Sequence, residues 1–136
     1  MQPFHLAFPV HDLQATKAFI IDVLGARLGR ESDRWVDFDF FGHQVTAHLD
    51  PNAKPASHNP VDGKKVPTFH FGVVLEWSKW EALAARCREK GLDFIIEPYV
   101  RFQGEVGEQA TFFIKEPSGN GIEFTSFKDM GQLFAA

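Results

Sequence analysis

The chain has one cysteine, Cys87, among its 136 residues, so it cannot form an internal disulfide. It has no run of like charge and no basic stripe, and its formal net charge is −4. Nothing in this pattern indicates binding to nucleic acid or to an anionic membrane. The N-terminus has neither a basic segment nor a long apolar run, so we expect no export signal and no membrane span. These absences favour a cytoplasmic protein whose partner is a small molecule.

Apolar residues are abundant, by contrast, and support a globular protein with a real core. The hydrophobic content is 44% and includes fifteen phenylalanines. A chain of this length can bury one core of useful size. We therefore predict a single domain over residues 1–136.

The first third of the chain predicts one β-α-β-β-β unit. Residues 3–10 are typical of a strand, Asp12 of a helix N-cap, and Gly25 of the position just after a helix, so the helix is expected from Leu13 to about Leu24. Strands are then predicted over residues 27–30, 35–40 and 44–49. Residues 51–67, rich in proline, are typical of a linker.

The same pattern starts again after the linker. A strand over 68–75 is followed by a helix to Lys90, with Ser78 and Glu81 predicted to form a capping box and Gly91 to end the helix. Strands are predicted over 94–96, 111–115 and 121–126, with an irregular segment over 98–109. The tail, 128–136, has too little pattern to assign.

Three pairs of residues with nearly equal spacing relate the two halves of the chain. His5 and His70 are 65 residues apart, Asp12 and Ser78 are 66 apart, and Gly25 and Gly91 are 66 apart. The sequence thus predicts an α+β fold of two repeats, over residues 1–50 and 68–127, that form a curved mixed sheet around a concavity.

Three residues are candidate metal ligands because they alternate away from the apolar rows of their strands. They are His5 in the first strand of repeat one, His70 at the equivalent place in repeat two, and Glu123 in the last strand. A lone strand histidine is usually an ordinary core or surface residue. Two histidines at equivalent repeat positions with one carboxylate are a ligand set that leaves positions open on a divalent metal.

Three further residues are weaker candidates for the same site. Gln44, Thr46 and His48 alternate with Val45, Ala47 and Leu49, so His48 should face the concavity with the polar row. Tyr99 and Arg101 follow a proline in the irregular segment, where a surface position is the simpler interpretation. If that segment covers the pocket, Tyr99 could donate a hydrogen bond and Arg101 could hold an anionic substrate group. His11, His43 and His58 are expected to be solvated.

The chain resembles the vicinal oxygen chelate superfamily, which includes glyoxalase I, extradiol dioxygenases, fosfomycin-resistance proteins and bleomycin-binding proteins. The resemblance rests on FHLAFPVHDLQATKAFIIDVLGA at the start, FHFGVV after the linker and EPSGNGIEF near the end. It implies that His5, His70 and Glu123 occupy the family's three common ligand positions.

Within this superfamily the last strand pair looks most like the extradiol dioxygenase signature. Phe112, Glu116, Pro117, Gly119 and Glu123 fit that signature. Its tyrosine position holds Phe113, and its upstream histidine is absent. With these two departures, the resemblance of the five matching residues still implies a dioxygenase that acts on a catechol-like substrate and dioxygen.

Iron(II) is the metal this reading favours, with manganese, zinc or nickel as alternatives. The other functions to be weighed are a glyoxalase-type isomerase or lyase, and a metal-free protein that sequesters a small molecule. A homodimer is expected from the resemblance and from sheet edges that need cover.

Overall fold

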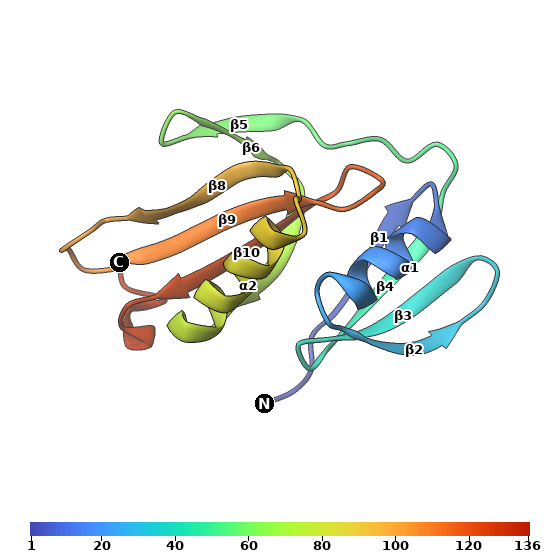
Figure 1. Cartoon of the computed structure of the whole chain (residues 1–136), viewed down its shortest axis with the longest axis horizontal. Coiled ribbons are helices and arrows are strands. Elements are labelled where there is room, and N and C mark those ends of the chain that lie inside the picture. The colour runs from blue at the N-terminus through green and yellow to red at the C-terminus, as the bar shows by residue number, and fades with distance from the viewer. The chain divides into compact units, whose positions relative to one another are not determined.

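Each predicted repeat forms one helix and one four-stranded mixed sheet in the computed structural model, which describes residues 1–136 (Figure 1). The chain divides into two compact units. Unit one comprises Met1–Pro55 and Glu116–Asn120, and unit two comprises Ala56–Lys115 and Gly121–Ala136. The α+β class and the two β-α-β-β-β repeats are confirmed. That the whole chain acts as a single domain stays a prediction.

Unit one contains the first repeat. Its elements are β1 (His5–Val10), α1 (Leu13–Asp22), β2 (Arg27–Glu31), β3 (Trp35–Phe40) and β4 (His43–Leu49), in the sheet order β1-β4-β3-β2. Strands β1 and β4 are parallel, and the other pairs are antiparallel. As predicted, Asp12 caps α1, since its Oδ1 accepts from the Ala15 N–H at 3.0 Å.

Unit two contains the second repeat with the same topology. Its elements are β5 (His58–Val61), β6 (Lys64–Pro67), β7 (His70–Val74), α2 (Trp77–Glu89), β8 (Phe94–Arg101), β9 (Gln109–Lys115), β10 (Gly121–Phe127) and the 3₁₀ helix η1 (Met130–Gln132). The sheet order is β7-β10-β9-β8, with β7 parallel to β10. His5 and His70 are each the first residue of the first strand of their repeat, as their spacing predicts.

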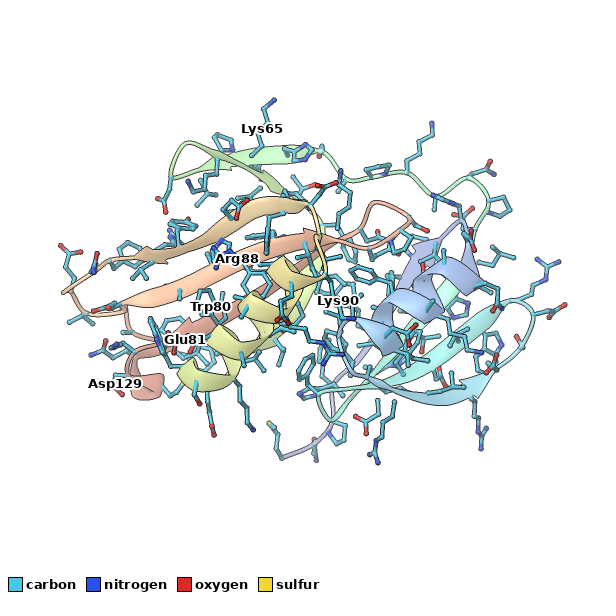
Figure 2. The ribbon with its side chains drawn as sticks, in the orientation of Figure 1. Lys65, Trp80, Glu81, Arg88, Lys90 and Asp129 are labelled. Carbon is cyan, nitrogen blue, oxygen red and sulfur yellow. The ribbon has the colours of Figure 1, made fainter.

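The two cores form on the helix-facing side of each sheet, because alternate residues of every strand point to that side. In unit one, Phe8 and Phe38 are fully buried, as is Ile20 of α1. In unit two, Trp80 of α2 lies against the sheet (Figure 2), and its indole N–H donates to the Phe124 carbonyl at 2.8 Å. The opposite faces keep the polar rows, so each helix fixes which face can carry a site. Neither helix has the length and hydropathy needed to span a bilayer.

Residues 51–67 were expected to be a linker, and this prediction is wrong for their second half. Strands β5 and β6 pair there as an antiparallel hairpin. Its turn is Asp62-Gly63, with φ of 52° and 74°. A two-residue hairpin turn with both residues at positive φ favours an Asp-Gly pair. The Asp62-Gly63 pair is thus a hairpin signal within the proline-rich segment.

Strand β8 is also longer than predicted, because it continues through Pro98 to Arg101. A proline lacks the N–H that a central strand needs, but β8 lies at the edge of its sheet. The pairing with β9 shifts register between Ile96 and Tyr99, which accommodates the proline. Tyr99 and Arg101 are therefore strand residues rather than loop residues.

The predicted capping box on α2 is wrong as well. The helix begins at Trp77, its N-cap is Glu76, and that residue makes no side-chain capping bond. The Trp80 N–H already donates to the Glu76 carbonyl at 2.9 Å, so Ser78 lies inside the first turn. The predicted stop at Gly91 is confirmed, with φ of 67°.

The turn between β9 and β10 belongs to unit one and is organised by a buried carboxylate. Glu116 is 1% exposed. Its Oε1 accepts from the Asn120 side chain at 2.7 Å and from two turn N–H groups, and its Oε2 accepts from the Thr16 hydroxyl of α1 at 2.8 Å. Both carboxylate oxygens of Glu116 thus accept hydrogen bonds from groups inside the fold. Glu116, which matches the extradiol signature, therefore has a structural role.

Candidate metal centre

His70 and Glu123 meet on the open face of the sheet of unit two. Strands β7 and β10 run parallel with His70 opposite Gly121 and Gly72 opposite Glu123, so the imidazole and the carboxylate lie diagonally across the strand pair on one face. The His70 Nε2 lies 3.1 Å from the Glu123 Oε1. The His70 Nδ1 lies 2.8 Å from the Pro67 carbonyl oxygen. Because a carbonyl can only accept, Nδ1 carries a proton, and Nε2 is the nitrogen available to a metal.

The surroundings of His70 favour the charged form of its imidazole beside Glu123. The hydrogen bond to Glu123 raises the pKa of His70, and the bond to Pro67 adds to this, while burial opposes it. An imidazole nitrogen and a carboxylate oxygen 3.1 Å apart on one face are donor types that would suit a divalent metal ion.

Residues around the pair hold it in place. The Thr111 hydroxyl donates to the Glu123 Oε2 at 2.6 Å, so Oε1 is the oxygen left facing His70. The Phe113 ring packs edge-on against the imidazole at 4.9 Å between centroids. Gly72 allows the close approach of β7 to β10, because a Cβ there would collide with the Glu123 carbonyl oxygen. Thr111 and Gly72 were not among the residues singled out from the sequence.

His5 lies in unit one, on the exposed face of β1, and is paired in register with Gln44 of β4. In the equivalent pairing of repeat one, Thr46 stands where repeat two has Glu123. The three predicted ligands are thus divided between the units. No group of three or more His, Cys, Asp or Glu side chains that could hold a metal is assembled. That His5 completes the ligand set stays a prediction.

The face of unit one beside His5 carries a carboxylate of its own. The Thr46 hydroxyl donates to the Asp37 Oδ1 at 2.6 Å. Asp37 and Gln44 line an open hollow of about 460 Å³ on this face. The hollow offers room for a small molecule beside the strand pair that holds His5.

His48 faces the same side of the sheet as His5, as its alternation predicts, and is exposed. Its partner on β1 is Pro9, four residues along the strand from His5. At about 3.3 Å per residue, the two imidazoles are anchored about 13 Å apart along the strand direction. A catalytic role for His48 stays a prediction, and the register gives it no direct contact with His5.

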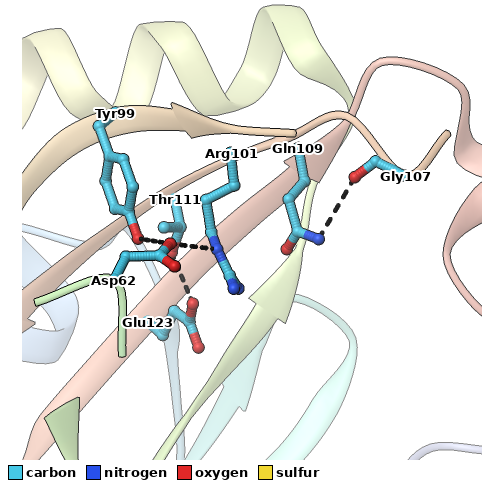
Figure 3. A network of polar contacts seen from close by, with 7 residues as sticks. All are labelled: Asp62, Tyr99, Arg101, Gly107, Gln109, Thr111 and Glu123. Atoms are coloured by element: carbon cyan, nitrogen blue, oxygen red, sulfur yellow. Dashed lines mark hydrogen bonds and ion pairs between the residues drawn. The ribbon is translucent and has the colours of Figure 1, made fainter. Parts of the chain in front are cut away.

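Tyr99 and Arg101 join the open face of unit two and share a partner that the sequence analysis missed, Asp62 at the tip of the β5–β6 hairpin (Figure 3). Tyr99 pairs in register with Thr111, so the phenol lies one strand beyond the hydroxyl that holds Glu123. Burial raises the pKa of Tyr99, and the bond to Asp62 adds to this. The structure therefore gathers His70, Glu123, Tyr99 and Arg101 on one face.

Comparison with known proteins agrees with this architecture. Residues 2–124 match the family described as Glyoxalase/Bleomycin resistance protein/Dioxygenase superfamily. A glyoxalase/bleomycin resistance protein/dioxygenase from Alicyclobacillus acidocaldarius is 30% identical, with a TM-score of 0.83 over 98% of this chain and 96% of that one. Among curated proteins, none matches the chain.

More distant solved structures share the fold alone. The fosfomycin resistance protein FosX from Listeria monocytogenes is 14% identical, with a TM-score of 0.72 over 97% of each chain. Lactoylglutathione lyase from Agrobacterium tumefaciens is 16% identical, with a TM-score of 0.68 over 99% of this chain and 97% of that one. These relatives differ in their named activities, so the fold does not decide between reactions.

Proposed function

Because the chain belongs to the Glyoxalase/Bleomycin resistance protein/Dioxygenase superfamily, we propose that it is a metal-dependent dioxygenase of extradiol type acting on a small catechol-like substrate. The observation that supports this most directly is the His70–Glu123 pair, with the imidazole fixed through Nδ1 and the carboxylate fixed through Oε2. Such fixed donors are typical of ligands that must keep a metal in place during turnover.

In this proposal His5, His70 and Glu123 hold one divalent ion, foremost iron(II), with manganese, zinc and nickel as alternatives. When bound, iron(II) supplies open coordination positions for a vicinal diol and dioxygen and the redox chemistry of ring cleavage next to the diol. The chain's own residues bind and orient the substrate. The Phe113 ring and the strand backbones close one side of the site against water.

Tyr99 and Arg101 are the groups best placed to contact substrate on unit two. The phenol of Tyr99 can donate a hydrogen bond, and the guanidinium of Arg101 can bind an acidic substituent. His48 is the candidate to take a substrate proton and return it, because a neutral imidazole can accept a proton and an imidazolium can donate one. Because His48 lies opposite Pro9, four residues along the strand from His5, it would act on a part of the substrate away from the His5 imidazole.

The proposed reaction is tested by anaerobic reconstitution with iron(II), followed by exposure of a panel of catechols to oxygen. We expect oxygen uptake and a yellow ring-opened product with at least one diol. No uptake with any diol, together with turnover of a thiohemiacetal by the nickel or zinc form, would establish a glyoxalase-type isomerase instead. Binding of a small molecule by metal-free protein without turnover would indicate a sequestering protein.

We also propose a homodimer, from the family resemblance and because each four-stranded sheet ends in edge strands that a second copy could cover. Sedimentation should give twice the chain mass of 15.4 kDa at micromolar concentration. A species of the single chain mass would overturn this proposal.

A further inference from the structure

The tip of the β5–β6 hairpin places a carboxylate against two donors of β8. The Asp62 Oδ2 accepts from the Arg101 Nε at 2.7 Å and from the Tyr99 hydroxyl at 3.1 Å (Figure 3). One oxygen therefore receives both bonds. The same arrangement would receive one oxygen of a carboxylate or phosphate group from a bound molecule.

Arg101 keeps hydrogen-bonding capacity beyond what Asp62 uses, whereas the single O–H of Tyr99 is already donated to Asp62. A guanidinium has five N–H groups, and only the Nε–H of Arg101 is engaged in a hydrogen bond. Lys64 adds a second positive charge, with its Nζ 4.6 Å from the centre of the Tyr99 ring. Its neighbour Lys65 projects away from the hairpin (Figure 2). The hairpin and β8 together form a cationic corner with one carboxylate in it.

This corner adjoins the candidate metal ligands within the same unit. Tyr99 is opposite Thr111 across the β8–β9 pair, and Thr111 bonds Glu123. Figure 3 shows the Arg101 and Tyr99 side chains extending over the same face as the Glu123 carboxylate. A small molecule held near Glu123 could thus place an acidic substituent at Arg101.

Asp62 itself is held loosely enough to leave. Its side chain is 44% exposed, against 25% for Arg101. It sits in a two-residue turn at positive φ, where Asp, Asn and Gly are the favoured residues. Its bonds to Arg101 and Tyr99 are the hydrogen bonds its carboxylate makes, so rotation of one side chain would vacate the corner.

We propose that Asp62 is a specificity-determining residue whose carboxylate occupies an anion site formed by Arg101 and Tyr99, and that an acidic group of the substrate takes its place. The inference deepens the proposed function and rests on it. It narrows the substrate class to small molecules that carry a carboxylate or similar anion beside the oxygens that bind the metal.

The test is a titration of metal-free protein with benzoate, followed by NMR, in the wild type and three variants. Asp62→Asn preserves the turn and removes the competing charge, so benzoate should bind about three- to fivefold more tightly, the scale of a partly exposed ion pair. Arg101→Gln should abolish the binding. Asp93→Asn is the matched control, since it removes one exposed charge of the same unit that has no partner.

Hydrogen exchange supplies a second readout. In the wild type, benzoate should speed exchange of amides at the hairpin tip, and in Asp62→Asn it should not. Equal benzoate affinity in the wild type and Asp62→Asn, or no benzoate binding in either, would overturn the proposal. Because no metal or oxygen is used, failure of the dioxygenase assay would leave this result standing, and the two failures are distinguishable.

Discussion

The Thr111 hydroxyl donates to the Glu123 Oε2 at 2.6 Å, and this bond decides which carboxylate oxygen faces His70. A threonine on β9 therefore orients a candidate ligand on β10 from the neighbouring strand. Residues that orient a metal ligand typically contribute to affinity although they never touch the ion.

Thr111→Val should accordingly weaken divalent metal binding about tenfold with little change in fold, since valine keeps the shape and removes the donor. The measurement is a metal titration by calorimetry. Thr125→Val is the matched control, because Thr125 lies on the same face of β10 without a side-chain hydrogen bond. Equal losses in the two variants would mean that the Thr111 bond has no specific role.

The hydrogen bonds of Glu116 in the β9–β10 turn should contribute to the stability of the fold. Glu116→Gln keeps the volume, but it replaces one accepting oxygen by an amide N–H₂ and removes the charge that strengthens the bonds from the Thr16 hydroxyl and the Asn120 side chain. We expect a loss of about 2 kcal/mol or more in the free energy of unfolding, measured in urea. Glu97→Gln, an exposed change on β8, should cost little. Similar stability of both variants would contradict the structural role of Glu116.

Cys87 should be unreactive in the native protein. It is fully buried on α2, and burial raises the pKa of its thiol to about 11. At pH 8 very little thiolate forms, and no reagent can reach the sulfur. A disulfide reagent should therefore label it only after unfolding. Stoichiometric labelling of native protein within seconds would show that α2 does not pack as described.

The His70–Glu123 pair should make the stability of metal-free protein depend on pH. The pKa of His70 is higher in the folded protein than in the unfolded chain. The pair therefore stabilises the fold fully at pH values below the pKa of His70 in the unfolded chain, and this stabilisation is lost as the pH rises through the pKa of His70 in the folded protein. His70→Gln should therefore cost more stability near pH 6 than near pH 9. Urea unfolding in the presence of a chelator measures this, and an equal cost at both pH values would contradict it.

Local chemistry explains what the sequence predicted well. Asp12 and Gly91 mark helix ends by interactions within a few residues, and strand alternation alone put His70 and Glu123 on the same open face. Both signals depend on near neighbours along the chain. They identified the pair without knowledge of the sheet order.

Features that depend on distant partners were missed. Pro98 predicts the start of an irregular segment, because the sequence does not reveal that β8 is an edge strand. Asp62 was hidden in a proline-rich segment, and its role depends on Arg101, 39 residues away. Glu116 matched a catalytic signature, but its partner Thr16 is 100 residues away and gives it a structural role.

The central claim is that Glu123 is the anionic ligand of one divalent metal, and metal content tests it most directly. Protein purified without added metal and reconstituted with iron(II) should bind about one ion per chain, and Glu123→Ala should lose most of it, because the ligand that carries the charge is gone. Circular dichroism of the variant checks that the fold is retained. A folded Glu123→Ala protein with full metal stoichiometry and unchanged affinity would contradict the account.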